Sequence, residues 1–228
     1  MNIEKILSCT DHTCLSQTAT WEDIRRLCDE GMAWGTASVC IPPSYVARAR
    51  QYVGDRLKIC TVVGFPNGYQ TTQVKAAETV EAIGCGADEI DMVVNLGDVR
   101  DGRDDAILRE IRLLKILCGE RVLKVIIETC LLSDDEKRRM CRLVTEAGAD
   151  FIKTSTGFSR GGATPEDVAL LRAHVGQNVR VKAAGGISSP DDAERMLAAG
   201  ADRLGSSRIV GLVRAMRGRG NPTADKSE

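Results

Sequence analysis

The distribution of hydrophobic and polar residues along the chain repeats a two-part pattern. Short runs rich in β-branched residues, such as TVVGF (61–65) and KVIIET (124–129), are followed by stretches in which apolar residues recur every three or four positions. The short runs are continuous rather than alternating, which is typical of parallel strands covered by helices. The pattern therefore predicts a series of strand–helix units.

Eight strands can be located in this way. They are predicted near 9–12, 36–41, 58–64, 89–95, 122–129, 151–156, 179–184 and 203–205. Helix start signals lie between them, in which a serine or threonine precedes an acidic residue by three positions. Three of these signals begin at Ser133, Thr164 and Ser189.

The phrase Gly-Ala-Asp occurs three times, and each time it joins a helical pattern to a β-rich run. Its glycines, Gly86, Gly148 and Gly200, are suited to left-handed helix caps and are 62 and 52 residues apart. Each gap holds two βα units of about 26 to 31 residues, the usual size of such a unit.

These units predict one α/β domain, a (β/α)8 TIM barrel over residues 1–216. A short N-terminal helix precedes it, and a flexible polar tail follows at 217–228. The rival fold is an open doubly wound sheet. The regular spacing of eight strands and the lack of a GxGxxG turn after the first strand count against that fold.

Composition and charge exclude several classes of partner. The 228 residues contain 31 Lys and Arg against 32 Asp and Glu, so the basic field that attracts nucleic acid or an anionic membrane is missing. No run of about 18 apolar residues occurs, and the N-terminus does not resemble a signal peptide. We expect a cytoplasmic protein that binds neither membrane nor nucleic acid.

Cysteine and histidine usage narrows the possible chemistry. The chain has nine cysteines and two histidines, and no CxxC pair. Scattered cysteines in odd number fit reduced, buried thiols better than disulfides or a zinc site. We therefore expect no metal and no cofactor, and lysine becomes the candidate reactive group.

Three predicted strands carry a charged residue where packing alone favours an aliphatic one: Asp91, Lys153 and Lys182. All three can point into one barrel interior. A structural ion pair of one lysine with Asp91 or Glu128 is the alternative interpretation for each residue. Lys124 and Glu128 share one face of the fifth strand, and for these two we expect an internal ion pair rather than a direct role.

Two lysines on adjacent strands favour a reactive site. Ammonium groups about 5 Å apart repel by about 3 kcal/mol at an effective dielectric constant near 20, which corresponds to about two pKa units. Such a shift brings a lysine pKa towards neutrality, where the free amine attacks carbonyls. The pattern predicts a Schiff-base lysine, a neighbouring cation that lowers its pKa, and an aspartate that transfers protons.

An anion site is predicted in the next two loops. Gly185 and Gly186 follow the seventh strand, and Gly205 to Ser207 end the eighth strand and open the next helix. Glycines expose backbone N–H groups, and the loops after strands seven and eight form the recurrent phosphate site of such barrels. The predicted substrate is a phosphorylated carbonyl compound.

Several segments, in this order along nearly the whole chain, resemble the deoxyribose-phosphate aldolase family. They are DHTCL (11–15), SVCIPP (38–43), CTVVGFPNG (60–68), EIDMVVNLGDVRDG (89–102), KVIIET (124–129), FIKTSTGF (151–158), VKAAGGI (181–187) and RLGSS (203–207). The resemblance implies a metal-free class I aldolase of deoxyribonucleoside catabolism. Such an enzyme splits 2-deoxy-D-ribose 5-phosphate reversibly into acetaldehyde and D-glyceraldehyde 3-phosphate.

The same resemblance assigns roles to individual residues. Lys153 becomes the Schiff-base nucleophile, Lys182 the cation that lowers its pKa, and Asp91 the proton donor and acceptor. Sugar or relay contacts fall to Asp11, Thr13 and Thr156, and phosphate contacts to Gly157, Gly185, Gly186, Gly205 and Ser207. A homo-oligomer, dimer or tetramer, is also implied.

One departure from the family pattern lies in the last of these segments. Arg208 follows Ser207 where a phosphate-binding serine is expected, so that contact is either lost or replaced by a charged one. Two other functions stay open: a Schiff-base enzyme for another aldose or ketose phosphate, and a non-catalytic barrel that senses sugar phosphates.

Overall fold

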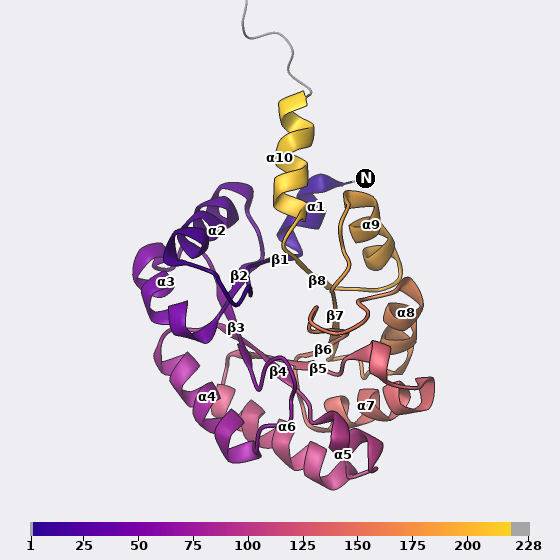
Figure 1. Ribbon diagram of the computed structural model, residues 1–228. Coiled ribbons are helices and arrows are strands. Elements are labelled where there is room, and N and C mark those ends of the chain that lie inside the picture. The colour runs from indigo at the N-terminus through magenta and orange to yellow at the C-terminus, as the bar shows by residue number, and fades with distance from the viewer. Residues whose placement is uncertain (1, 220–228) are drawn as a thin grey trace, which may run out of the picture.

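The computed structural model describes residues 2–219, which form a closed barrel of eight parallel strands in chain order with helices outside it (Figure 1). β1 pairs with both β2 and β8, which closes the ring. The strands are β1 (Thr10–Thr13), β2 (Ser38–Ile41), β3 (Ile59–Val63), β4 (Glu89–Val93), β5 (Val122–Ile126), β6 (Phe151–Lys153), β7 (Arg180–Ala184) and β8 (Arg203–Ser206). The predicted barrel and its eight strands are confirmed, and the open sheet is excluded.

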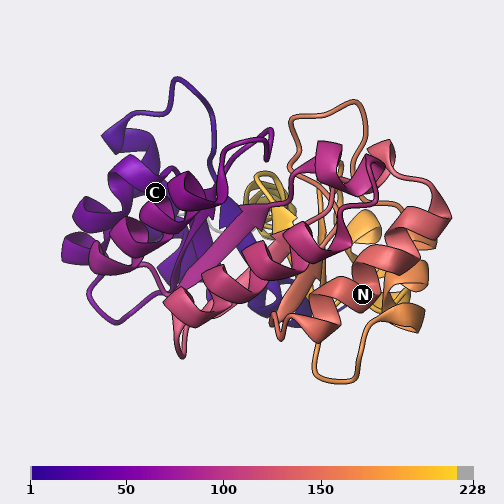
Figure 2. The ribbon, with the colours of Figure 1, turned by 90° about the horizontal axis from the view of Figure 1, so that it is seen from below.

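The helices connect successive strands and form an outer layer around the ring (Figure 2). They are α1 (Ile3–Ser8), α2 (Trp21–Trp34), α3 (Val46–Val53), α4 (Thr72–Gly84), α5 (Leu96–Arg100), α6 (Asp104–Cys118), α7 (Asp134–Glu146), α8 (Pro165–His174), α9 (Pro190–Ala198) and α10 (Ile209–Arg219), with short 3₁₀ turns η1 (Pro43–Tyr45) and η2 (Thr129–Leu131). Within the described residues, no helix is long and apolar enough to cross a membrane.

The repeated Gly-Ala-Asp phrase has a structural explanation in both its glycine and its aspartate. Each glycine has a positive φ, between 76° and 108°, which ends the helix before it. Each aspartate carboxylate accepts a hydrogen bond of 2.8 Å from a backbone N–H near the start of the preceding strand. The pairs are Asp88 with Ile59, Asp150 with Leu123, and Asp202 with Val181. The phrase thus fixes the register between neighbouring strands.

The predicted helix starts are also confirmed. The side chains of Ser133, Thr164 and Ser189 each accept a hydrogen bond from the backbone N–H three residues later. Each cap satisfies a backbone donor that the first helical turn leaves unpaired.

The barrel separates its apolar core from its polar interior. Outward-facing strand residues such as Val39, Ile90 and Val181 are fully buried against the helices and form the hydrophobic core. The inward-facing positions of the strands include charged residues, described below. Burial of the core between barrel and helices leaves the interior free for chemistry.

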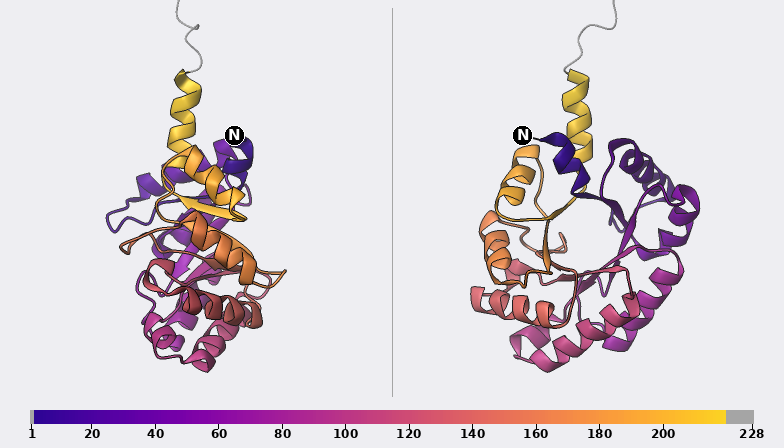
Figure 3. Two further views of the ribbon diagram at one scale, coloured as in Figure 1. Left: turned by 90° about the vertical axis from the view of Figure 1, so that its right-hand side faces the viewer. Right: turned by 180° about the vertical axis from the view of Figure 1, so that it is seen from behind.

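The two ends of the described chain lie close together at one side of the barrel. The predicted N-terminal helix is present as α1, and α10 extends away from the ring beside it (Figure 3). α10 continues to Arg219, so the predicted boundary at residue 216 falls inside this helix. Arg217 places its guanidinium 5.1 Å from the ring centre of Trp34 on α2. The rest of the predicted tail, 220–228, lies outside the described residues.

Candidate active site

Asp91 on β4 is the centre of a buried cluster of charged side chains inside the barrel. Its Oδ2 accepts hydrogen bonds from Lys153 Nζ at 2.8 Å and from Lys182 Nζ at 2.7 Å. Its Oδ1 accepts one from Lys124 Nζ at 2.8 Å. The structure therefore brings the predicted trio of Asp91, Lys153 and Lys182 into direct contact and adds a third lysine.

Strand register explains why these side chains meet. Asp91 pairs with Lys124 across β4 and β5, and Lys153 pairs with Lys182 across β6 and β7. Paired residues on neighbouring parallel strands place their side chains on the same face of the sheet, and here that face is the barrel interior.

A second group of charges lies beside this trio. Asp11 Oδ2 is 2.5 Å from Lys182 Nζ, and its Oδ1 accepts a hydrogen bond of 2.6 Å from Arg203 Nη1. Glu89 Oε2 is 2.6 Å from Lys124 Nζ and 3.3 Å from Arg203 Nη1. Together the cluster combines four basic side chains, Lys124, Lys153, Lys182 and Arg203, with three carboxylates.

Sequence reasoning missed Glu89 and Arg203. The available signal was weak: Glu89 stands two residues before Asp91, so strand alternation places it on the same face. Arg203 begins a strand, where a charged residue is commonplace.

Lys124 takes part in an internal ion pair as expected, but Glu128 is not its partner. Lys124 bonds Glu89 and Asp91 instead. Glu128 accepts hydrogen bonds from the backbone N–H and the hydroxyl of Thr156. The reason is that β5 ends at Ile126, so Glu128 lies beyond the strand and does not follow its alternation.

Mutual contact fixes the charge states of the cluster. Burial disfavours a charged carboxylate, but the ammonium groups of Lys124, Lys153 and Lys182 together hold the pKa of Asp91 well below its ordinary value. Burial likewise disfavours a charged lysine, yet the carboxylates of Asp11 and Asp91 raise the pKa of Lys182 above its ordinary value. Both groups are therefore charged at neutral pH.

The repulsion argument from the sequence considered two lysines in isolation. In the structure a carboxylate lies between them, because both ammonium groups donate to one oxygen of Asp91. Lys182 is thus a cation next to Lys153 at neutral pH, as expected. Its effect on the reactivity of Lys153 stays a prediction.

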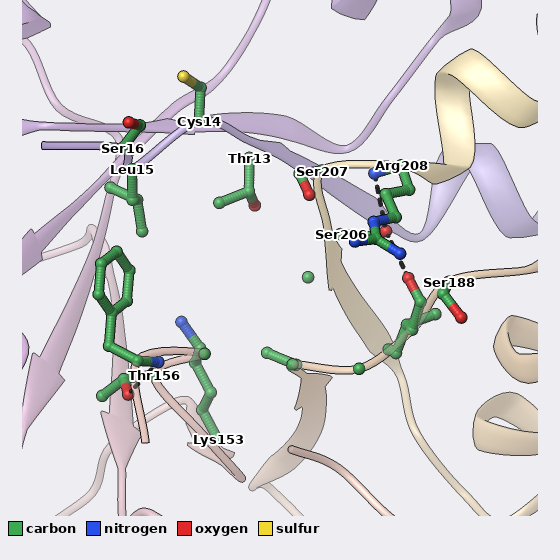
Figure 4. A pocket seen from close by; sticks show the side chains of 17 residues that line it. Thr13, Cys14, Leu15, Ser16, Lys153, Thr156, Ser188, Ser206, Ser207 and Arg208 are labelled. Atoms are coloured by element: carbon green, nitrogen blue, oxygen red, sulfur yellow. Dashed lines mark hydrogen bonds between the residues drawn. The ribbon is translucent and has the colours of Figure 1, made fainter. Parts of the chain in front are cut away.

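Lys153 is the member of the cluster that reaches a cavity of about 630 Å³ at the carboxyl ends of the strands (Figure 4). Among the predicted site residues, those lining the cavity besides Lys153 are Thr13, Thr156, Gly157, Gly185, Gly186, Gly205 and Ser207. Asp91, Lys182 and Asp11 do not line it and are fully buried. Asp11 therefore fits the relay role, through Lys182, better than a sugar contact.

The loops after β7 and β8 form one side of this cavity. Gly185 and Gly186 have φ of 79° and 77°, a conformation that favours glycine. Ser206 Oγ accepts from the N–H groups of Arg208 and Ile209 and donates to the carbonyl of Ile187. Ser206 thus caps α10, and Ser206, Ser207 and Arg208 all line the cavity.

An aromatic contact that the sequence did not single out lies at the cavity edge. Phe158 lines the cavity and meets Phe65 edge to face, with ring centres 5.2 Å apart. Phe158 is half exposed, so its ring is available to shield a bound molecule from water.

Potential metal ligands also gather inside the barrel, although no CxxC motif signals them. Cys40, Cys60 and Asp91 place ligand atoms within 4.8 Å of one another, as do Asp11, Cys60 and Glu89. In both sets the carboxylates already contact lysine ammonium groups. A cation bound there would have to displace or approach those like charges, which is unfavourable.

A barrel whose interior lysine opens into a cavity bounded by glycine-rich loops has the parts that an enzyme acting on phosphorylated carbonyl compounds needs. The chain belongs to the DeoC/LacD aldolase family, because the family model matches residues 5–213. The resemblance noted from the sequence motifs is thereby confirmed.

Individual relatives agree with this assignment. A deoxyribose-phosphate aldolase of Clostridioides difficile is 55% identical over 212 residues, 93% of this chain and 97% of the relative. A putative deoxyribose-phosphate aldolase of Coccidioides immitis superposes with a TM-score of 0.92 at 40% identity, covering 95% of this chain and 87% of its own. The deoxyribose phosphate aldolase of Aeropyrum pernix, described as a unique tetrameric structure, has a TM-score of 0.86 at 33% identity, covering 95% and 92%.

Proposed function

We propose that this aldolase cleaves 2-deoxy-D-ribose 5-phosphate reversibly to D-glyceraldehyde 3-phosphate and acetaldehyde. The observation that carries the proposal is the position of Lys153. The side chain of Lys153 lines the cavity, and its amine donates a hydrogen bond to Asp91. Asp91 also accepts a hydrogen bond from Lys182. The names of the relatives support the choice of substrate.

In the proposed reaction the neutral amine of Lys153 attacks the C1 aldehyde of the open-chain sugar phosphate. Loss of water gives an iminium ion, which accepts electrons from the breaking bond. The C3 hydroxyl loses its proton, the C2–C3 bond breaks, and D-glyceraldehyde 3-phosphate departs. The remaining enamine is protonated, and hydrolysis releases acetaldehyde and free Lys153.

The buried cluster supplies the proton transfers of this sequence. Asp91 contacts Lys153 directly and is proposed to accept and return protons, by way of water for the C3 hydroxyl. Lys182 is proposed to share in the transfer and to supply a fixed positive charge. Asp11 bonds Ser38 and Arg203 and holds Lys182 in place.

The phosphate group is proposed to bind at the opposite side of the cavity from Lys153. Gly157, Gly185, Gly186, Gly205 and Ser207 line that cavity and offer backbone and hydroxyl donors. Arg208 lines it too, and no bond of its guanidinium group to another described residue exists. We propose that this group forms a charged contact in place of the expected serine.

Borohydride trapping tests the proposal. Incubation with 2-deoxy-D-ribose 5-phosphate and borohydride, followed by peptide mapping, is expected to give one stable adduct, on Lys153. Lys58→Ala, at an exposed lysine, should leave the adduct unchanged, whereas Lys153→Ala should abolish it. The absence of an adduct, or an adduct on another lysine, would refute the role assigned to Lys153. Faster cleavage of another sugar phosphate in a panel of substrates would refute the proposed substrate.

We also propose that the protein forms a homo-oligomer and is located in the cytoplasm. The tetrameric relative supports a homo-oligomer, dimer or tetramer, which sedimentation analysis of the purified chain would measure. All nine cysteines are free thiols, which supports a reducing compartment such as the cytoplasm.

A further inference from the structure

Glu128 has a left-handed backbone conformation, which is uncommon for a residue other than glycine. Its φ of 52° makes it the one non-glycine residue with a positive φ within residues 2–219. It is also a buried acidic residue, with 3% of its surface exposed. Both properties oppose folding, so the structure around Glu128 must stabilise it in this position.

Within residues 2–219, Thr156 of the neighbouring loop makes all the hydrogen bonds of the Glu128 carboxylate. The N–H of Thr156 lies 3.3 Å from both carboxylate oxygens, and the Thr156 hydroxyl donates to Oε2 at 2.5 Å. No cation forms an ion pair with Glu128 among the residues described, so these hydrogen bonds alone compensate its burial. The backbone N–H of Thr129 adds a bond of 2.8 Å to the carbonyl of Thr154.

The loop held in this way is the one that follows Lys153. Thr156, Gly157 and Phe158 all line the cavity, and the N–H of Phe158 donates to Thr156 Oγ1 at 3.0 Å. The hydroxyl proton of Thr156 is committed to Glu128. Towards a ligand this hydroxyl can therefore only accept a hydrogen bond, which suits a sugar hydroxyl and excludes donation to a phosphate oxygen.

We propose that Glu128 is a positioning residue that clamps loop 154–158 in the shape required to bind the phosphorylated substrate. A buried carboxylate is unfavourable unless hydrogen-bond donors stabilise its charge. The donors from Thr156 do this and at the same time set the loop. The inference deepens the proposed function and rests on it for the identity of the ligand.

Two variants separate the clamp from general stability. Glu128→Asn suits a left-handed backbone but is too short to reach Thr156, whereas Glu128→Gln keeps an acceptor oxygen at the original length. We expect Glu128→Asn to raise KM for 2-deoxy-D-ribose 5-phosphate about tenfold, the loss of roughly one hydrogen bond, with kcat nearly unchanged. Glu128→Gln should restore most of the affinity.

Two further readouts test how Glu128 acts. Borohydride trapping of Lys153 with acetaldehyde, which has no phosphate, should proceed at the original rate in Glu128→Asn. Because Glu128 acts through Thr156, Glu128→Asn should add little to the effect of Thr156→Val in the double variant. An unchanged KM, an equal loss of acetaldehyde trapping, or additive effects would each overturn the proposal.

Hydrogen exchange tests the clamp without using catalysis. The amide of Thr156 should be protected in the unmodified protein and exchange faster in Glu128→Asn, because its acceptor is removed. Rapid exchange in the unmodified protein would refute the clamp even if the enzyme cleaves the expected substrate. Slow exchange with no adduct on Lys153 would refute the proposed function and keep the clamp.

Glu110→Gln is the matched control for these measurements. Glu110 is a buried carboxylate in the helical layer, where it bonds Lys75 Nζ at 2.8 Å. This variant should lower stability while leaving KM and the Thr156 amide exchange unchanged.

Discussion

Lys153 and Lys182 donate hydrogen bonds to the same oxygen of Asp91, at 2.8 and 2.7 Å. The two lysines are register partners on adjacent strands, so their side chains start from neighbouring positions on the same face of the sheet. One carboxylate thus holds the proposed nucleophile and its neighbouring cation together. Proton transfer among the three requires no large movement of the backbone.

Replacement of Lys182 by methionine should impair catalysis without removing the nucleophile. Lys182 contacts both Asp11 and Asp91, so its loss removes a fixed charge and a proton-transfer partner. We expect kcat to fall by about 10² to 10⁴, the usual range for a general acid–base group. Stopped-flow kinetics with a borohydride-trapping assay would measure both turnover and adduct formation.

Lys75→Met provides the control for this variant. Lys75 is an equally buried lysine that bonds Glu110 outside the cluster. The Lys75→Met variant should be less stable than the unmodified protein and have the same kcat. Wild-type turnover in Lys182→Met would contradict the role proposed for Lys182.

Replacement of Arg208 by glutamine should weaken binding of phosphorylated substrates specifically. A hydrogen bond to a charged group contributes about 1.5–3 kcal/mol, which corresponds to about a 10- to 150-fold increase in KM. Cleavage of unphosphorylated 2-deoxy-D-ribose should keep its kcat/KM, because it lacks the anion. Arg138→Gln, an exposed side chain on α7, is the control. An equal loss with both substrates would show that Arg208 does not recognise phosphate.

Stability should decrease in acid because of the buried carboxylates. The pKa values of Asp11 and Asp91 lie below the ordinary 3.8, since nearby cations outweigh the effect of burial. The unfolded chain therefore binds more protons, and the free energy of unfolding should fall as pH drops below about 4. Urea unfolding at pH 3, 4 and 7 would measure this slope, which should be shallower in Asp11→Asn.

Lys124 and Lys182 have the opposite pH dependence. Their carboxylate partners raise the pKa of Lys124 and Lys182 against the effect of burial, so their contribution is complete below about pH 10.5 and is lost only above it. The free energy of unfolding should accordingly stay level between about pH 6 and 9 as far as Lys124 and Lys182 determine it. A steep change across that range in the unmodified protein, absent from Lys124→Met, would contradict the assigned charge states.

Replacement of Gly162 by alanine should disturb the loop after β7. A Cβ at Gly162 would lie 2.4 Å from the carbonyl carbon and oxygen of Gly185, so the two backbones cannot keep their positions. We expect a loss of about 1–3 kcal/mol in the free energy of unfolding, together with a higher KM. Gly84→Ala, at an exposed helix end with open space around it, should be neutral or stabilising by up to about 1 kcal/mol. An unchanged KM in Gly162→Ala would show that the Gly185 loop does not contact the substrate.

Much of the architecture could be predicted because it depends on local patterns. The Gly-Ala-Asp joints and the caps at Ser133, Thr164 and Ser189 act within a few residues of themselves, and the structure contains each of them. The three central residues of the site could be identified because a charged residue inside an apolar strand contradicts simple packing.

Other parts of the site could not be predicted, because they depend on contacts between distant segments. Lys124 and Glu128 are an even number of positions apart, so a continuous strand would place both side chains on one face. The strand ends at Ile126, before Glu128, and the expected pairing is lost. Its partner, Thr156, is 28 residues away. Cys40, Cys60 and Asp91 likewise meet only because the barrel closes.

The sequence by itself determined the number and order of the strand–helix units and the charged residues inside otherwise apolar strands, since both follow from residue type and short-range periodicity. The tertiary structure alone decided which charges pair. Inside a closed barrel, each ionic side chain must satisfy its charge with the nearest inward-facing partner. That is why Asp91 holds three lysines, Asp11 bonds Arg203, and Glu128 faces Thr156 instead of Lys124.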